Sequence, residues 1–241
     1  MVAERESVID ALDLTIDAHV HTGFAAGRDS VGVVVSAADQ AGLTALTFAD
    51  QVGPDTTWLS AYADAVRRAR QRTELTLRVA AEVEVVQPDG WLAWPADLGQ
   101  LEAVSVAVSR LPLAGALHDP RDVRAMLAAG ELTAAQVAEG LVVATVQGLE
   151  RASRYAPTQL ARPLGLLAQV GLEDAVLTDD LVGALAVACR ETGTVVEVSE
   201  AWRCPSARLV TLLRAAEVTL VPASDARYAG EVGRWQYVRR V

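Results

Sequence analysis

Lysine and asparagine are both absent from this 241-residue chain, so all 21 basic residues are arginines. With 31 acidic residues, the formal net charge is −10. Such a chain has no broad basic stripe to displace the counterions of nucleic acid or of an anionic membrane surface, and we expect neither as a partner. A local group of arginines can still attract a single anion.

Cysteine is scarce, because Cys189 and Cys204 are the only two and cannot form a disulfide framework. Apolar stretches such as 141–146 and 181–189 fall well short of the roughly 20 residues that a membrane helix needs. The first residues lack the basic and then apolar pattern of a signal peptide. We therefore expect a cytoplasmic protein.

Hydrophobic residues make up 51% of the chain and charged residues 22%, which is typical of a protein with a large buried core. No linker, low-complexity run or short internal repeat interrupts the sequence. We expect residues 1–241 to form a single domain.

Strand-like and helix-like stretches alternate along the chain. The expected strands, rich in Val, Leu, Ile, Ala and Thr, are 14–18, 45–49, 75–86, 103–109, 194–199 and 218–223, with a weaker seventh near 159–164. The expected helices are 30–41, 58–72, 120–127, 133–155, 179–192 and one opened by Pro205 and running through 217. Repeated strand–helix units imply right-handed crossovers, hence a parallel barrel or a doubly wound sheet.

Polar residues recur where these strands end. They are Asp17, His19, His21, Asp50, Gln51, Glu82, Glu84, Ser109, Arg110, Arg162, Glu197, Ser224, Asp225 and Arg227. In a parallel barrel the carboxyl ends of the strands meet at one face, where active sites are built. The positions therefore predict one polar site.

His19 and His21 make the strongest pattern at this face, since the chain has only three histidines. Two histidines separated by one residue in an extended segment point the same way and can hold one cation. An isolated pair of this kind is more often a surface feature. Carboxylates at the other strand ends favour metal ligation instead.

Glu82 lies between apolar residues, and buried carboxylates are rare unless they are paired or bound to metal. Strand alternation puts Glu84 on the same face. Asp225 taken alone is better explained as the cap of a short helical turn over 228–230. His118 falls in a turn before a helix, where we expect a surface position.

Read in order, these segments resemble the PHP family, the polymerase and histidinol phosphatase domains, over nearly the whole chain. The matching segments are 17–22 (Asp-x-His-x-His-Ser/Thr), 42–51 (normally ending Thr-Asp-His), 81–84 with 89–90 (Gly-x-Glu and an Asp-Gly turn), 108–110 (Ser-x-His), 161–163 (Ala-His-Pro), 196–199 (Val-Glu-Val-Asn) and 224–227 (Ser-Asp-Ala-His). The resemblance implies an α/β fold, a distorted TIM-like (β/α)7 barrel.

Members of that family typically bind three divalent cations and hydrolyse phosphate esters, while others are exonuclease or structural domains of bacterial DNA polymerases. The resemblance implies that one cation site is intact, since its ligands all remain: His19, His21, Glu82 and Asp225. Two nitrogens and two carboxylates suit Zn, Mn or Fe. We expect one such ion, or none if the barrel is only a scaffold.

The other two family sites have lost their histidines. Arg110 and Arg162 stand at second-site positions, and Gln51 and Arg227 at third-site positions. A guanidinium has no lone pair to give and stays protonated. Two hypotheses explain the three arginines equally well. One is drift after loss of activity. In the other, the arginines replace the charge of the lost cations and bind a phosphate-like anion.

Two functions follow. One is a phosphate-ester hydrolase reduced to one metal site and weak or inactive, acting on a phosphorylated small molecule, with Asp50 or Glu197 as proton carrier. The other is a non-catalytic domain on the same barrel that binds phosphate or another anion, or a partner protein.

Overall fold

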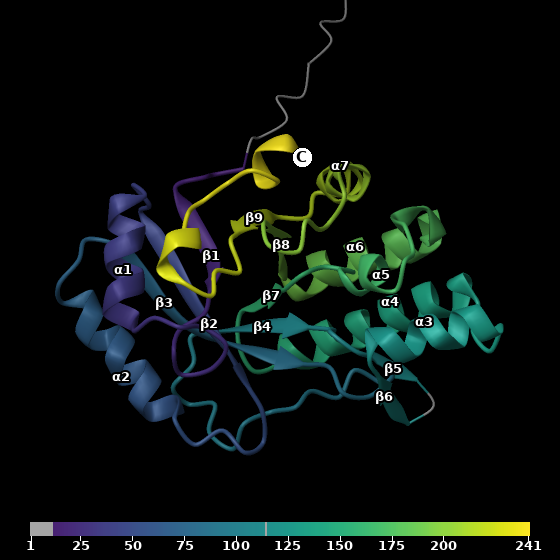
Figure 1. The fold of residues 1–241 in the computed structure, drawn as a ribbon, viewed down its shortest axis with the longest axis horizontal. Coiled ribbons are helices and arrows are strands. Elements are labelled where there is room, and N and C mark those ends of the chain that lie inside the picture. The colour runs from purple at the N-terminus through teal and green to yellow at the C-terminus, as the bar shows by residue number, and fades with distance from the viewer. Residues whose placement is uncertain (1–11, 114) are drawn as a thin grey trace, which may run out of the picture.

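The computed structural model describes residues 12–113 and 115–241 (Figure 1). Its main sheet is parallel, with neighbouring strands in the order β1-β2-β3-β4-β7-β8-β9. The bounds of these strands are β1 Ile16–Val20, β2 Ala45–Val52, β3 Thr76–Glu84, β4 Ala103–Ala107, β7 Thr158–Leu160, β8 Val195–Ser199 and β9 Leu220–Ala223.

Backbone hydrogen bonds join the first strand to the segment that follows the last one. The Asp225 N–H donates to the His19 carbonyl, and the His21 N–H donates to the Ala226 carbonyl, each over 2.9 Å. These bonds bring the two edges of the sheet together and nearly close it. The fold is an α/β barrel of seven parallel strands, which confirms the expected architecture.

Helices cover the outside of the barrel, with α1 and α2 on one side and α3 to α6 on the other (Figure 1). Their bounds are α1 Val31–Gln40, α2 Leu59–Arg70, α3 Pro120–Ala129, α4 Ala134–Ala152, α5 Leu166–Gln169, α6 Asp179–Thr192 and α7 Ala207–Ala215. Polar N-caps start several of them; the Thr133 hydroxyl, for example, accepts the Gln136 N–H in a capping box.

The two faces of the strands differ in chemistry. In β3, Val79 and Val83 belong to the apolar clusters that pack against the helices. Ala80 and Glu82 alternate with them and therefore face the barrel interior. Ala80 packs there against alanines of β2 and β4. Small residues thus fill the base of the barrel, and polar residues gather toward the carboxyl ends of the strands.

The first two strands lie differently from their predicted bounds. Strand β1 begins at Ile16, two residues later than expected, because the Asp13 carboxylate accepts the N–H and the hydroxyl of Thr15 and holds a turn there. Strand β2 continues to Val52, so Asp50 and Gln51 are strand residues. The site residues of these strands are therefore held by the sheet ladder rather than by loops.

Two further expectations were wrong. A hairpin of β5, Leu111–Leu113, and β6, Ala116–His118, precedes α3, so His118 is a half-buried strand residue and not a surface turn. Helix α7 begins after Pro205, because the Ser206 hydroxyl accepts the Leu209 N–H and caps it.

Among residues 12–113 and 115–241, no helix is both long enough and apolar enough to cross a membrane. The start of the chain, on which the expectation about a signal peptide rests, lies outside the described residues. The cytoplasmic location stays a prediction.

Candidate metal centre

His19 is fully buried at the end of β1, and a carboxylate fixes its ring. Its Nδ1 lies 2.7 Å from Oε1 of Glu197, which also accepts from Nε2 of Gln159 over 2.5 Å. With the Nδ1 proton donated to Glu197, the ring presents Nε2 to the barrel interior. That nitrogen lies 3.3 Å from Oε2 of Glu82, and neither atom has a hydrogen-bond partner among the residues that the structure describes.

His21 is equally buried and lies beside the last strand. Its Nε2 is 2.8 Å from Oδ1 of Asp225, and its Nδ1 is 3.7 Å from Oδ1 of Asp50. Asp225 has a left-handed backbone with φ 53°, which aspartate tolerates better than most residues. The 3-10 turn that follows, Ala229–Glu231, starts without a side-chain cap. The capping explanation of Asp225 is therefore wrong, because its carboxylate is hydrogen-bonded to the His21 ring instead.

Glu82 divides its two oxygens between different partners. Oε1 accepts from Nη2 of Arg162 over 2.6 Å and from Nε2 of Gln51 over 2.8 Å. Oε2 accepts from no donor within residues 12–113 and 115–241, and it faces His19. Strand register explains the contact with Gln51, since the two residues are paired across β2 and β3.

Four buried polar atoms of the described residues have no hydrogen-bond partner, and all belong to predicted ligands: His19 Nε2, His21 Nδ1, Glu82 Oε2 and Asp225 Oδ2. Buried polar groups are nearly always satisfied, so such a cluster needs an explanation. His19, His21 and Glu82 each offer a ligand atom, all within 4.8 Å of one another. A divalent cation fits this donor set of imidazole nitrogens and carboxylate oxygens.

The surrounding carboxylates set the charge of both histidines. Burial opposes a charge on His19, yet Glu197 and Glu82 outweigh it and raise the pKa of His19 well above its usual value. Burial also opposes a charge on His21, but its hydrogen bond to Asp225 raises the pKa of that ring. Both rings therefore attract protons when no cation is present.

The carboxylates respond in the opposite direction. Burial alone raises the pKa of Glu82, but Arg162 and His19 hold it well below its usual range. The pKa of Asp225 is likewise lowered, since the hydrogen bond from His21 and the charge of His19 exceed the effect of burial. Both carboxylates are ionised and available to a cation.

Asp17, the first residue of the Asp-x-His-x-His motif, performs a structural task. Its oxygens accept the backbone N–H groups of Ser224 over 2.9 Å and Gly233 over 3.1 Å. Burial raises the pKa of Asp17 to about 6 in spite of these bonds. The residue ties β1 to the segment after β9 and so places His19 beside Asp225.

The two predicted proton carriers also hold other groups in place. The carboxylate of Asp50 accepts both the backbone N–H, over 2.8 Å, and the hydroxyl of Thr22. Glu197 is fully buried between His19 and Gln159. The structure thus shows two orienting carboxylates, and their role in proton transfer stays a prediction.

The three predicted anion-binding arginines have different surroundings. Arg162 is buried, pairs with Glu82, and has Nη1 3.8 Å from Oδ2 of Asp225. Arg110 is half-buried, and its backbone N–H donates to Glu84 over 3.1 Å. Arg227 is exposed. Arg162 is thus engaged inside the barrel, and the binding of one anion by all three arginines stays a prediction.

Arg162 is held on more than one side. Its Nη2 donates to Oγ of Ser109 over 3.1 Å, and its guanidinium carbon lies 4.8 Å from the ring centroid of Trp202. Its backbone is left-handed, with φ 47°. Burial opposes the charge, but the negative charges of Glu82 and Asp225 outweigh this effect and raise the pKa of Arg162 above its ordinary value. The result is a permanent cation fixed among the carboxylates.

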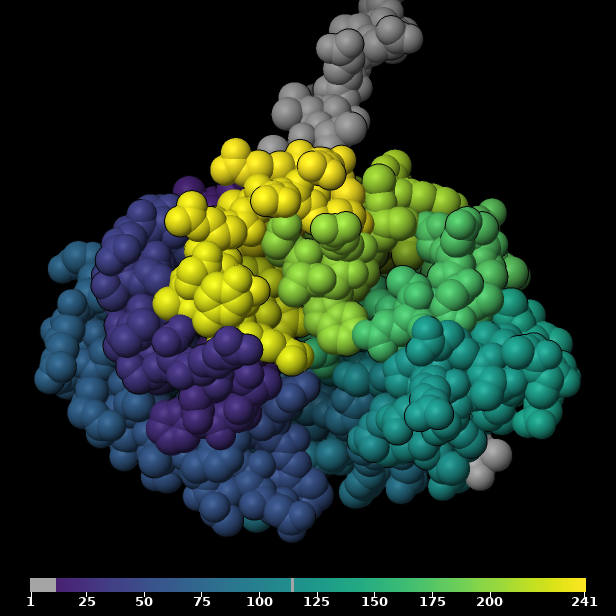
Figure 2. Space-filling model, in the orientation of Figure 1, coloured from purple at the N-terminus to yellow at the C-terminus, as the bar shows by residue number. Residues whose placement is uncertain are grey.

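A cavity of about 520 Å³ lies beside Asp225. Its lining residues are Ala26, Arg28, Ala201, Trp202, Asp225, Arg227, Tyr228 and Glu231. The Arg28 N–H donates to the Arg227 carbonyl over 2.8 Å, so the segments after β1 and β9 lie side by side (Figure 2). Arg28 and Trp202 were not predicted as site residues. A signal for Trp202 existed, since it follows the end of β8 by three residues.

The solved structures include one with a closely similar fold. A protein from Listeria monocytogenes, described as a histidinol phosphatase, aligns with a TM-score of 0.68 over 91% of this chain and 97% of its own, at 11% identity. The resemblance to PHP phosphoesterases is thereby confirmed at the level of the fold.

Two other structures align less well. They are an N-isopropylammelide isopropylaminohydrolase from Burkholderia multivorans (TM-score 0.44, 16% identity, 88% of this chain and 62% of that one) and a metal-dependent phosphoesterase from Bifidobacterium adolescentis (TM-score 0.39, 16% identity, 89% and 88%). No family model and no curated protein sequence matches the chain.

Proposed function

We propose that this protein is a metal-dependent phosphoesterase that holds one divalent cation, Zn, Mn or Fe, through His19, His21, Glu82 and Asp225. The observation that carries the proposal is the cluster of four buried, unpartnered ligand atoms at the carboxyl ends of the strands. When bound, such a cation supplies Lewis-acid activation of a phosphate ester.

The contacts of Glu82 support a single ion. A carboxylate that bridges two cations with one oxygen on each needs both oxygens, but Oε1 of Glu82 already accepts from Arg162 and Gln51. Only Oε2 is free for a ligand bond. The Arg162 guanidinium adds a fixed positive charge at this point and cannot itself coordinate metal.

Other residues of the chain orient the ligands and admit the substrate. Glu197, held by Gln159, keeps Nε2 of His19 turned inward. The cavity beside Asp225 has a volume typical of sites for small molecules, roughly 300–1,000 Å³. Arg227 at its wall can attract the phosphate group of a phosphorylated small molecule.

We expect this chemistry to be slow. Hydrolysis at clustered metals depends on ions that stabilise both the attacking and the leaving oxygen, and one ion serves both needs poorly. Turnover of p-nitrophenyl phosphate should stay below roughly 1 per second, the lower end of ordinary enzyme rates.

A non-catalytic phosphate-binding protein is the second candidate. The observation that favours it is the buried ion pair of Arg162 with Glu82, which commits one oxygen of a predicted ligand to the protein itself. This candidate predicts that phosphate raises the melting temperature in a saturable way. Hydrolysis should then be absent at every metal loading.

Elemental analysis of the untreated protein tests the metal proposal. About one equivalent should be found, and it should fall below roughly a tenth in the His19→Ala, His21→Ala double variant, because metal affinity depends on the number of protein ligands. His118→Ala removes the third histidine, on β6, and is the matched control that should leave the metal content unchanged. Two or more equivalents in the unmutated protein would contradict a single site.

A further inference from the structure

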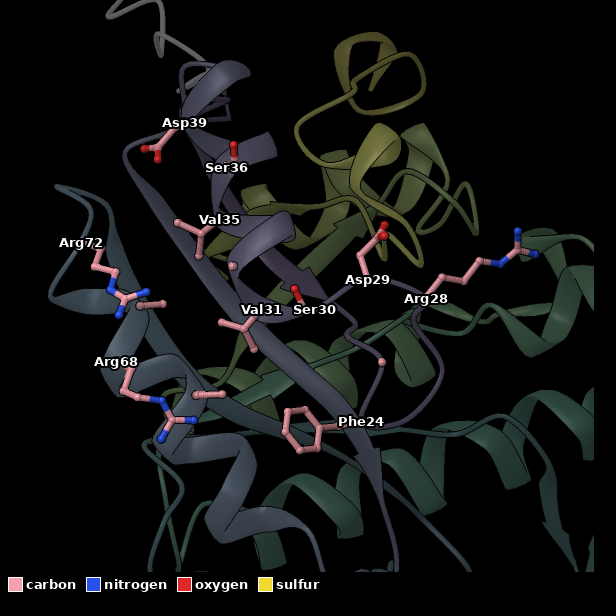
Figure 3. A pocket seen from close by; sticks show the side chains of 14 residues that line it. Phe24, Arg28, Asp29, Ser30, Val31, Val35, Ser36, Asp39, Arg68 and Arg72 are labelled. Atoms are coloured by element: carbon pink, nitrogen blue, oxygen red, sulfur yellow. The ribbon is translucent and has the colours of Figure 1, made fainter.

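A second cavity, of about 790 Å³, lies on the outer wall of the barrel between α1 and α2 (Figure 3). Val31 and Val35 line it from α1, and Ala65 and Ala69 line it from α2. None of its lining residues is a predicted metal ligand. The small side chains of α2 leave room between the helices, so this groove is a site separate from the metal centre.

One end of the groove has an aromatic wall. Phe24 lines it, and the ring of Phe24 lies 5.6 Å from that of Trp58 and 5.7 Å from that of Tyr62, centroid to centroid. Aromatic contacts at these distances are favourable and fix the ring in place. The groove therefore offers a flat apolar surface that is already formed.

The arginines of α2 and of the turn after it divide into two kinds. Arg67 pairs with Asp64 over 2.5 Å, and Arg70 pairs with Glu102. Arg68 and Arg72, which line the groove, form no ion pair or side-chain hydrogen bond with any residue the structure describes. They are four residues apart, with Arg68 on α2 and Arg72 in the turn that follows it, and extend from the same side of the groove (Figure 3).

The acidic residues of the groove keep their charge and accept hydrogen bonds from neutral groups. Asp29 accepts the Ala229 N–H over 2.7 Å, and Asp39 accepts the Thr73 hydroxyl over 3.1 Å. Neither forms an ion pair with Arg68 or Arg72 among the described residues. Arg68 and Arg72 are thus two available cations on one side of the groove, on a protein whose net charge is −10. Arg28 also lines the groove but extends away from these two arginines (Figure 3).

We infer that this groove binds a small amphiphilic anion, with its apolar body against Phe24 and the alanines of α2 and its phosphate, sulfonate or carboxylate group on Arg68 and Arg72. Guanidinium groups recognise such anions through paired hydrogen bonds. The volume lies within the range of small-molecule sites, roughly 300–1,000 Å³.

Titration with anilinonaphthalene sulfonate tests the inference, since this dye joins an aromatic body to one anionic group and fluoresces when it binds apolar surface. The folded protein should bind it saturably, near one equivalent. The Arg68→Gln, Arg72→Gln double variant should bind at least about tenfold more weakly, the effect of losing one charge-assisted hydrogen bond. The uncharged dye phenylnaphthylamine should bind both proteins equally.

Matched controls separate this site from general charge effects. Arg121→Gln with Arg124→Gln removes two exposed arginines at a similar spacing on α3, and should leave dye affinity within about twofold. Arg227→Gln probes the cavity beside the metal centre and should also leave the dye affinity of the groove unchanged. Equal weakening in the α3 variant, or weakening in Arg227→Gln alone, would overturn the assignment.

Discussion

The two sides of the barrel mouth differ in how they supply positive charge. On the side formed by β1, β3 and β9, histidines stand beside Glu82 and Asp225, and their charge depends on bound protons or on a cation. On the side formed by β4 and β7, Arg162 supplies a permanent charge, because its guanidinium stays protonated. Equivalent positions at strand ends can thus carry either exchangeable or fixed charge.

The comparison also shows that the arginine side is not uniform. Arg162 is buried against two carboxylates, whereas Arg110 is half-buried and has no ion pair with a described residue. The desolvation that makes a buried pair costly to break does not act on a solvated arginine. Substituting the two arginines separately therefore gives the sharpest contrast.

The largest effect is expected for Arg162→Ala. Removing Arg162 takes the permanent cation away from the buried carboxylates of Glu82 and Asp225, and should lower the free energy of unfolding by about 3–5 kcal/mol. Arg110→Ala should change it by no more than about 0.5 kcal/mol. Urea denaturation in the presence of a chelator measures both. Similar losses from the two variants would show that burial does not distinguish these arginines.

A smaller effect is expected on the histidine side from Glu197→Gln. The amide no longer holds the Nδ1 proton of His19 as a carboxylate does, so metal affinity should fall about 10–100-fold at unchanged stoichiometry. Competition with a chromogenic chelator measures the affinity. Glu200→Gln is the control, since that carboxylate accepts backbone N–H groups near Tyr237 instead. Unchanged affinity in Glu197→Gln would remove Glu197 from the site.

The smallest effect is expected from Trp202→Leu, which removes the ring against which Arg162 rests. A partly desolvated cation–π contact contributes about 1–2 kcal/mol, so the free energy of unfolding should fall by that amount. Trp91→Leu is the matched case, because Arg151 lies 5.6 Å from the centroid of that half-exposed ring. It should lose only about 0.5–1 kcal/mol. A larger loss from Trp91→Leu would reverse the comparison.

Much of the candidate site could be predicted because polar residues stand out in apolar strands. His19, His21 and Glu82 interrupt buried segments, and a parallel barrel brings such positions to one face. The groove arginines could not be found in this way. Arg67, Arg68, Arg70 and Arg72 look alike along the chain, and only the packing of α1 beside α2 makes two of them face a cavity.

The sequence by itself determined the alternation of strands and helices and the residues at the strand ends, because periodicity and turn signals act locally. The choice of a seven-stranded barrel over a doubly wound sheet came from the resemblance to the PHP family. Tertiary structure alone decided how those residues share their hydrogen bonds. Arg110 and Arg162 each follow the end of a strand, yet only Arg162 lies inside the barrel, where it pairs with Glu82. Contacts between residues some 80 positions apart depend on how the strands are arranged in space, which no local pattern encodes.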